Sequence, residues 1–131
     1  MNYLDATQEA GIDFYQKYHQ KGKIHMLNLL KFRKNVDSAI LSNVDNDLSG
    51  EEVYNQYLNL MDTMFRKAGS KILYKGKGNS FLIGPESEKW DLILLVEHQT
   101  VSRFIALAQT EDYKAIEKYR HASLEDSRLL P

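Results

Sequence analysis

The stretch Trp90-Asp91-Leu92-Ile93-Leu94-Leu95-Val96-Glu97-His98 decides the fold class, together with Ile24-His25-Met26-Leu27-Asn28-Leu29-Leu30-Lys31-Phe32. Both segments are typical of β-strands, and both carry apolar residues at successive rather than alternate positions. An antiparallel strand with one face in water alternates apolar and polar residues. We therefore expect both faces of these strands to be covered, one by helices of the same chain and the other by the sheet of a second copy.

The segments around these two strands complete an α+β pattern. A capping box at Ser49 and an apolar stripe predict a long helix, and Gly69 stands where that helix should end. In chain order we expect a helix over 49–68, strands over 70–76 and 79–84 with a bend between them, a strand over 90–98, helices over 100–108 and 112–122, and a strand over 124–130. The order β-α-β-β-α-β predicts a ferredoxin-like antiparallel sheet with its helices on one face.

Two segments lie outside this repeating order. Residues 1–22 predict an extra N-terminal helix whose apolar stripe runs through Leu4, Ala10 or Gly11, Ile12, Tyr15 and Tyr18. The loop over 34–48 is long for its place, and we interpret it as a surface insertion rather than a lid over a barrel mouth. The whole chain, 1–131, is expected to form one domain with its barrel core in 24–131.

Composition excludes several classes of function. The chain has 131 residues, a net charge of −1 and no cysteine, which removes disulfides, thiolate metal sites and a cysteine nucleophile. The near-neutral charge argues against nucleic-acid or membrane partners, and the RNA-binding variant of this fold would need aromatic residues where Leu92 to Leu95 stand. No segment approaches the roughly 20 apolar residues of a membrane helix, and the first 20 residues are not a signal peptide. We expect a cytoplasmic homodimer.

Several motifs follow one another in the order of a known family. They are Met26-Leu27-Asn28-Leu29-Leu30-Lys31-Phe32-Arg33, Gly84-Pro85, Trp90-Asp91, Leu95-Val96-Glu97, Tyr113-Lys114-Ala115-Ile116, Arg120 through Ala122 and Leu124 through Leu129. From about Ile24 onward the chain resembles short, mostly bacterial domains of unknown function in the dimeric α+β barrel superfamily. The resemblance implies a ferredoxin-like sheet paired with that of a second copy. That superfamily includes cofactor-independent monooxygenases, haem-degrading enzymes, lactone isomerases and non-catalytic proteins, and fold does not decide among them.

Asn28 is the first candidate for ligand binding, because its side chain demands hydrogen bonds in the middle of an apolar strand. On a cavity wall it would offer a donor and an acceptor to a bound molecule. The alternative is a buried amide that fixes strand register. Both alternations of this strand are apolar, so the sequence does not decide which face carries Asn28.

Five further residues complete the predicted site. His25 and His98 end the two apolar strands and are candidates for general acid or base, or else are ordinary rim histidines. Trp90 and Tyr74 are candidates for walling a ligand pocket, with a core or interface anchor as the alternative. Arg120 would bind a ligand carboxylate or else form an ion pair.

The sequence predicts no metal site and no cofactor. No histidine pair has metal-ligand spacing. Asp45 to Gly50 imitates the start of a calcium loop, but Gln56 stands where the loop needs a bidentate glutamate. Two lysine-rich clusters, Lys31 with Arg33 and Lys34, and Lys71 with Lys75 and Lys77, are explained by solvated edge charges or by attraction of an anion.

Two functional hypotheses follow. The first is a barrel that binds a small apolar or weakly anionic molecule, with or without a cofactor-independent reaction of monooxygenase or isomerase type. The second is a non-catalytic homodimer whose interior is filled by side chains. A cavity of about 300 Å³ or more, with polar groups converging on it, favours the first.

Overall fold

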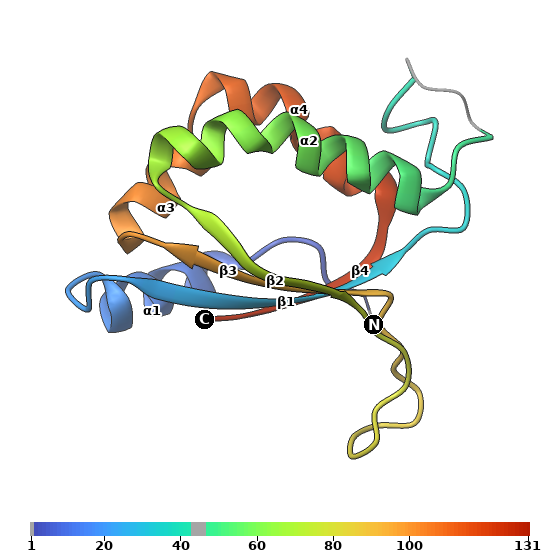
Figure 1. The fold of residues 1–131 in the computed structure, drawn as a ribbon, viewed down its shortest axis with the longest axis horizontal. Helices are drawn as coiled ribbons and strands as arrows, with labels where there is room; N and C mark the ends of the chain where they lie inside the picture. The colour runs from blue at the N-terminus through green and yellow to red at the C-terminus, as the bar shows by residue number, and fades with distance from the viewer. Residues whose placement is uncertain (1, 43–46) are drawn as a thin grey trace.

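The computed structural model describes residues 2–42 and 47–131. Its elements are α1 (Gln8–Tyr18), β1 (Ile24–Phe32), α2 (Gly50–Ala68), β2 (Lys71–Lys77), β3 (Leu92–His98), α3 (Val101–Ala108), α4 (Glu111–Ser123) and β4 (Leu124–Leu130). The strands form one antiparallel sheet in the order β2-β3-β1-β4, and α2 and α4 lie across one of its faces (Figure 1). The predicted ferredoxin-like α+β fold is confirmed.

The ends of α2 form as the sequence predicts. The Ser49 hydroxyl accepts the backbone N–H of Glu52 at 3.1 Å, and the Glu52 carboxylate reaches back to the Ser49 N–H, which completes a capping box. At the other end Gly69 takes a left-handed conformation with φ 71°, where a side chain would be strained. These two signals hold the helix to the length that spans the sheet.

The core lies between the sheet and its helices. On β3 the buried residues Leu92, Leu94 and Val96 face α2 and α4, while Ile93 and Leu95 between them point to the other face and stay half-buried. On β1 the same alternation places Leu30 in the core and Leu29 on the opposite face. We call the face that the helices leave uncovered the open face of the sheet.

The segment expected to be a strand over 79–84 is an arm. Within it the structure gives a single bridge, between Ser80 and Lys89, and the chain leaves the sheet on the side of the open face (Figure 1). At the tip Leu82 and Ile83 are 99% and 91% exposed. The prediction was wrong because the apolar run Phe81-Leu82-Ile83 has the composition of a strand but finds no neighbouring strand to pair with.

The apolar stripe expected for the N-terminal helix was also misplaced. Ile12 and Tyr15 are half-exposed, and Phe14 and Tyr18 instead pack with Met26 of β1. The Thr7 side chain caps α1 at Ala10, so Leu4 precedes the helix and cannot belong to its stripe. None of the helices in the described residues is long and apolar enough to cross a membrane.

The long connection between β1 and α2 packs at one end of the helical layer. Val36 and Leu41 are buried against Val53 of α2 and Ala122 of α4. This contact holds Val36 and Leu41 against the helical layer. The interpretation of the loop over 34–48 as a surface insertion rather than a lid stays a prediction. The segment that imitates the start of a calcium-binding loop, Asp45 to Gly50, falls partly on residues 43–46, outside the described residues.

Candidate ligand-binding cavity

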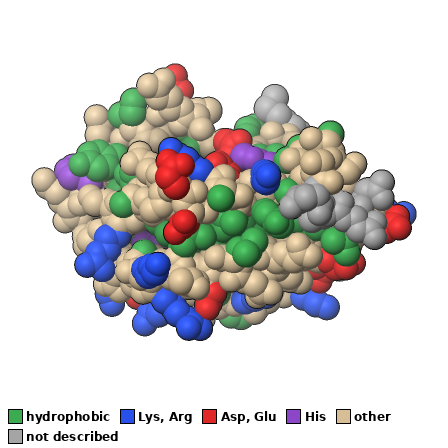
Figure 2. Space-filling model, turned by 90° about the horizontal axis from the view of Figure 1, so that it is seen from above, with side chains coloured by type: hydrophobic (Ala, Val, Ile, Leu, Met, Phe, Trp, Pro, Cys, Tyr) green, Lys and Arg blue, Asp and Glu red, His purple; other side chains and the backbone are tan. Residues whose placement is uncertain are grey.

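A cavity of about 440 Å³ lies between the sheet and the helices. Its apolar wall comes from both layers, including Met26, Leu94, Val96, Tyr57, Met61, Phe65, Phe104 and Leu107. Its polar wall contains Asn28, His98, Tyr113 and Arg120. Seen from the helix side, the molecule presents apolar side chains among interspersed charges of both signs (Figure 2).

Asn28 lies on the helix-facing side of β1, opposite Leu94 of β3 and Leu129 of β4. Its Nδ2 donates one long hydrogen bond, 3.3 Å, to the backbone carbonyl of Met26. That bond uses one of the two amide hydrogens, and the Oδ1 has no partner among the described residues. The amide therefore keeps a donor and an acceptor for a molecule in the cavity.

His98 ends β3 in the cavity wall between the rings of Phe65 and Phe104. Its Nδ1 lies 2.7 Å from the Ser70 hydroxyl, which leaves Nε2 for a ligand. Burial lowers the pKa of His98 from 6.5 to about 4, because an imidazolium in this apolar setting would lose its hydration. At neutral pH the ring is therefore uncharged, with one nitrogen available as a donor or an acceptor according to the tautomer.

Two tyrosines face each other across the cavity. The hydroxyls of Tyr57 on α2 and Tyr113 on α4 are 2.9 Å apart. Burial is the main cause that raises the pKa of both phenols, so both stay protonated at neutral pH. Only one of the two hydrogens is needed for their mutual bond, so the pair retains a donor.

Arg120 brings positive charge to the wall, with its side chain 20% exposed. Its guanidinium donates to the Leu4 carbonyl at 2.6 Å and to the Ser127 hydroxyl at 3.3 Å, which ties the N-terminal segment to α4 and β4. Asp5 lies 3.8 Å away. Both hydrogen-bond acceptors are neutral and the Asp5 carboxylate offsets only part of the charge, so the remainder is available to an anionic ligand.

Asp5, Glu117 and His121 gather at the margin of the cavity, with ligand atoms within 4.8 Å of one another. Sequence spacing did not reveal this cluster, because Asp5 lies more than a hundred residues from the other two. The His121 Nε2 already lies 2.8 Å from the Asp5 carboxylate, which also faces Arg120. We read the cluster as an ion-pair network that fastens the N-terminal segment.

The structure brings together Asn28, His98 and Arg120 and separates the other three predicted residues from them. His25 points to the open face, where its Nε2 lies 3.0 Å from Glu97. Tyr74 is 55% exposed on the edge strand β2.

Trp90 is buried before β3, with the Arg128 guanidinium 4.9 Å from its ring centroid, and it does not line the cavity. The residues of β3 that line the cavity are Leu94, Val96 and His98, further along the chain than Trp90. Tyr57 and Tyr113 line the cavity but were not among the predicted site residues. The signal for Tyr57 is its place in the apolar stripe of the helix that follows Ser49.

Comparisons with known proteins identify relatives by structure. No family model matches the chain, and no curated protein matches it. The RPA0582 protein of Rhodopseudomonas palustris, of unknown function, is 30% identical over 99% of this chain and 95% of its own, with a TM-score of 0.85. Its methylated form gives 29% identity over 98% and 92%, with a TM-score of 0.86. A dimeric protein of unknown function and ferredoxin-like fold from Bacteroides fragilis gives 16% identity over 84% and 94%, with a TM-score of 0.50.

The fold and the cavity thus define a ferredoxin-like α+β protein with an internal site. The chain belongs to the family of the RPA0582 protein, a family of unknown function, and the resemblance drawn from the sequence is confirmed.

Proposed function

We propose that this protein is a homodimer that binds a small, largely apolar molecule in the cavity between its sheet and its helices. The observation that carries the proposal is the cavity of about 440 Å³ on which polar groups converge from an apolar wall. This volume falls within the range of small-molecule sites, roughly 300–1,000 Å³. A filled interior would have supported a purely structural protein.

The polar groups suggest what the ligand carries. Asn28 and His98 each offer hydrogen bonds from the sheet, and the tyrosine hydroxyls offer a donor from the helices. Arg120 favours a ligand with a weakly acidic group such as a carboxylic acid, a phenol or an enol.

A cofactor-independent reaction would use the same groups. With a pKa of about 4, His98 binds a ligand as a neutral partner and is a poor proton acceptor in the empty cavity. An anionic ligand close to Nε2 would raise that pKa toward neutrality, because a nearby negative charge stabilises the imidazolium. Proton transfer by His98 is therefore tied to ligand binding.

The open face of the sheet supports the part of the proposal that concerns the homodimer. Leu27, Leu29, Ile93 and Leu95 form an apolar patch that the protomer leaves half-exposed. At one end the patch is bordered by Glu97 and its neighbours His25 and Lys71. An apolar centre with a charged rim is the usual anatomy of a protein–protein interface. The dimeric Bacteroides fragilis protein shares the fold.

Asn28→Leu tests the ligand site. The substitution removes both hydrogen-bonding groups and fills part of the cavity. We expect a bound molecule to be lost while the free energy of unfolding changes by about 1 kcal/mol or less, because Asn28 makes only one long hydrogen bond. Native mass spectrometry of the purified protein reports both the dimer mass and any adduct that denaturation removes.

Asn59→Leu, on the exposed side of α2, is the matched control and should keep the adduct. Where the purified protein carries no adduct, small aromatic carboxylic acids and phenols serve as probes in the same measurement. Retention of the ligand by Asn28→Leu, with a higher free energy of unfolding, would show that Asn28 only fixes the strand.

A further inference from the structure

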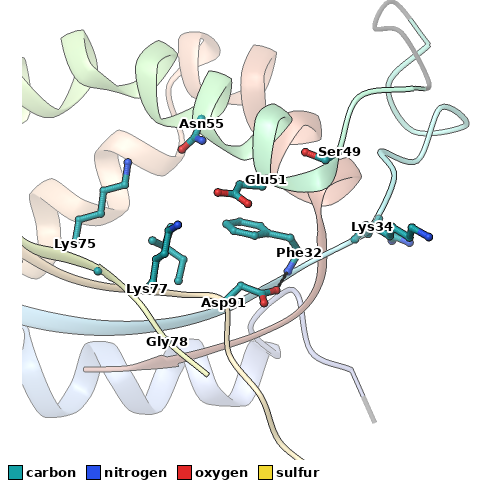
Figure 3. A pocket seen from close by; sticks show the side chains of 12 residues that line it. Phe32, Lys34, Ser49, Glu51, Asn55, Lys75, Lys77, Gly78 and Asp91 are labelled. Atoms are coloured by element: carbon teal, nitrogen blue, oxygen red, sulfur yellow. Dashed lines mark hydrogen bonds between the residues drawn. The ribbon is translucent and has the colours of Figure 1, made fainter. Parts of the chain in front are cut away.

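A second cavity, of about 670 Å³, opens at the other end of the helical layer. It lies between the edge strand β2 and the first turns of α2, and Phe32 at the end of β1 forms part of its wall (Figure 3). Its residues are separate from those of the first cavity, since the two share none of their lining residues. Whatever binds here is independent of the ligand proposed above.

Two lysines of β2 reach into this space. Lys75 and Lys77 pair with Leu94 and Leu92, whose side chains point toward the helices. Because alternate residues of a strand share a face, both lysines stand on the helix side of the sheet. In Figure 3 their ammonium groups rise toward Glu51 and Asn55 of α2. Lysines whose only role is to protect a strand edge from pairing with another chain do not have to point toward a helix.

The charge of these lysines is left uncompensated. Across residues 2–42 and 47–131, neither Lys75 nor Lys77 is within ion-pair distance of a carboxylate, whereas Lys71 on the same strand pairs with Glu97 at 3.9 Å on the open face. Of the two carboxylates in the cavity wall, Asp91 already accepts the Phe32 N–H at 2.8 Å. The pair of ammonium groups therefore faces open space with little to balance it.

The rest of the wall adds to the positive potential. Arg33 also lines the cavity, and its buried Nε has no acceptor among the described residues. The N-terminus of α2 carries the partial positive charge of a helix start. The lining includes four basic and two acidic residues, of which Lys34 directs its side chain away from the lysines of β2 (Figure 3). Electrostatics alone would draw a small anion into this end of the molecule.

We propose that the second cavity binds a small molecule through anionic oxygens, carboxylate or phosphate, held between Lys75 and Lys77. Asn55 supplies an amide to the same molecule. Glu51, in the same wall, can accept a hydrogen bond from a hydroxyl or ammonium group where the molecule carries one. The site thus takes polar metabolites that the first cavity, with its apolar wall, would reject.

The test is an NMR titration of the whole protein with inorganic phosphate and, separately, with succinate, at constant ionic strength maintained with chloride. We expect saturable shifts of the backbone amides of residues 32–34, 49–55 and 75–78 with at least one of the two anions. Saturation with phosphate alone or with succinate alone identifies which oxygens the site prefers. No saturable shift with either anion would overturn the proposal, as would shifts spread over the whole basic surface.

Variants separate binding from edge protection. Lys75→Gln with Lys77→Gln should weaken anion binding by about tenfold or more, since charge-assisted hydrogen bonds are the strong ones. Lys71→Gln, on the same strand but the opposite face, should bind as the wild type does. Glu51→Gln should bind phosphate more tightly, because a like charge is removed. Unchanged affinity in the double lysine variant would contradict the proposal, and the Glu51 variant keeps the test valid if the double variant folds poorly.

Discussion

The two faces of the sheet are both apolar, but they differ in what covers them. Toward the helices Leu30, Leu94 and Val96 are 1%, 3% and 5% exposed. On the open face Leu29 and Leu95 remain half-exposed, although they lie beside these residues in the same strands. The polar groups differ too, because those on the helix side turn into a cavity while those on the open face form ion pairs at its rim. This difference underlies our proposal of a small molecule on the helix side and a second protein surface on the open face.

Among the substitutions that test this difference between the two faces, Leu95→Asp should have the largest effect. If a second copy covers the open face, the new carboxylate is buried without a partner at the centre of the interface. An uncompensated buried charge costs about 3–5 kcal/mol, so we expect the dissociation constant of the dimer to rise at least about a hundredfold. Analytical ultracentrifugation over a range of concentrations measures the shift from dimer to 15.2 kDa monomer.

Leu60→Asp supplies the control for that experiment. Leu60 lies on the outer side of α2, is 45% exposed and faces away from the sheet. The variant should remain a dimer. A dimer that survives Leu95→Asp and dissociates with Leu60→Asp would place the interface on the helices and refute the role given to the open face.

Leu30→Ala and Leu29→Ala compare the two faces at neighbouring positions. Leu30 is buried in the core of the protomer, so its truncation should lower the free energy of unfolding by about 2–5 kcal/mol at any protein concentration. Leu29→Ala should cost less, and its cost should depend on concentration because it acts through the dimer. Urea unfolding at two protein concentrations distinguishes the cases. Equal, concentration-independent losses would mean that the protomer itself covers both faces.

The sequence predicted the sheet and α2 because their signals are local. Continuous apolarity over Leu92 to Val96 indicates a strand covered on both faces, and Ser49 and Gly69 mark the helix ends whatever packs around them. The arm over 79–84 was predicted wrongly because local signals do not report strand pairing. A strand forms only where it pairs with a neighbouring strand. The residues Phe81 to Ile83 do not indicate whether such a neighbour is present.

Part of the candidate site could be predicted from the sequence. Asn28 stood out as a polar residue in an apolar strand, and the end of β3 marked His98. The sequence did not decide which face carries Asn28, because both alternations of β1 are apolar. Helix packing decides it, and the same packing brings Tyr57 and Tyr113 together from positions 56 residues apart.

Acid should affect the two faces in different pH ranges. The unfolded chain protonates His98 near pH 6.5, whereas the folded protein protonates it only near pH 4. Between these values the unfolded state holds more protons, so stability is lost as the pH falls through this window, by up to about 3 kcal/mol. On the open face the hydrogen bond from His25 lowers the pKa of Glu97 below 4.5, so its contribution is lost only below that pH.

Urea unfolding of the wild type and His98→Gln between pH 4.5 and 7.5 measures the difference. The variant should lose most of the slope above pH 5. Ser70→Ala should keep it, because burial rather than the Ser70 hydroxyl lowers the pKa of His98. A wild-type slope in His98→Gln would assign the acid sensitivity to other groups and remove the support for a neutral His98 in the cavity.

The arm over 79–84 gives the smallest expected effect in the comparison of the two faces. Its residues belong to neither face of the sheet of their own protomer. Leu82 and Ile83 contact almost nothing in the protomer, so Leu82→Ser with Ile83→Ser should leave the free energy of protomer unfolding within about 0.5 kcal/mol. The arm projects on the side of the open face, where a second copy would lie, and we expect it to bury these two side chains there (Figure 1). Losing that burial should weaken the dimer by at least about tenfold, which sedimentation equilibrium resolves. An unchanged dissociation constant, beside a large effect of Leu95→Asp, would confine the interface to the sheet and leave the apolar tip free for a different partner.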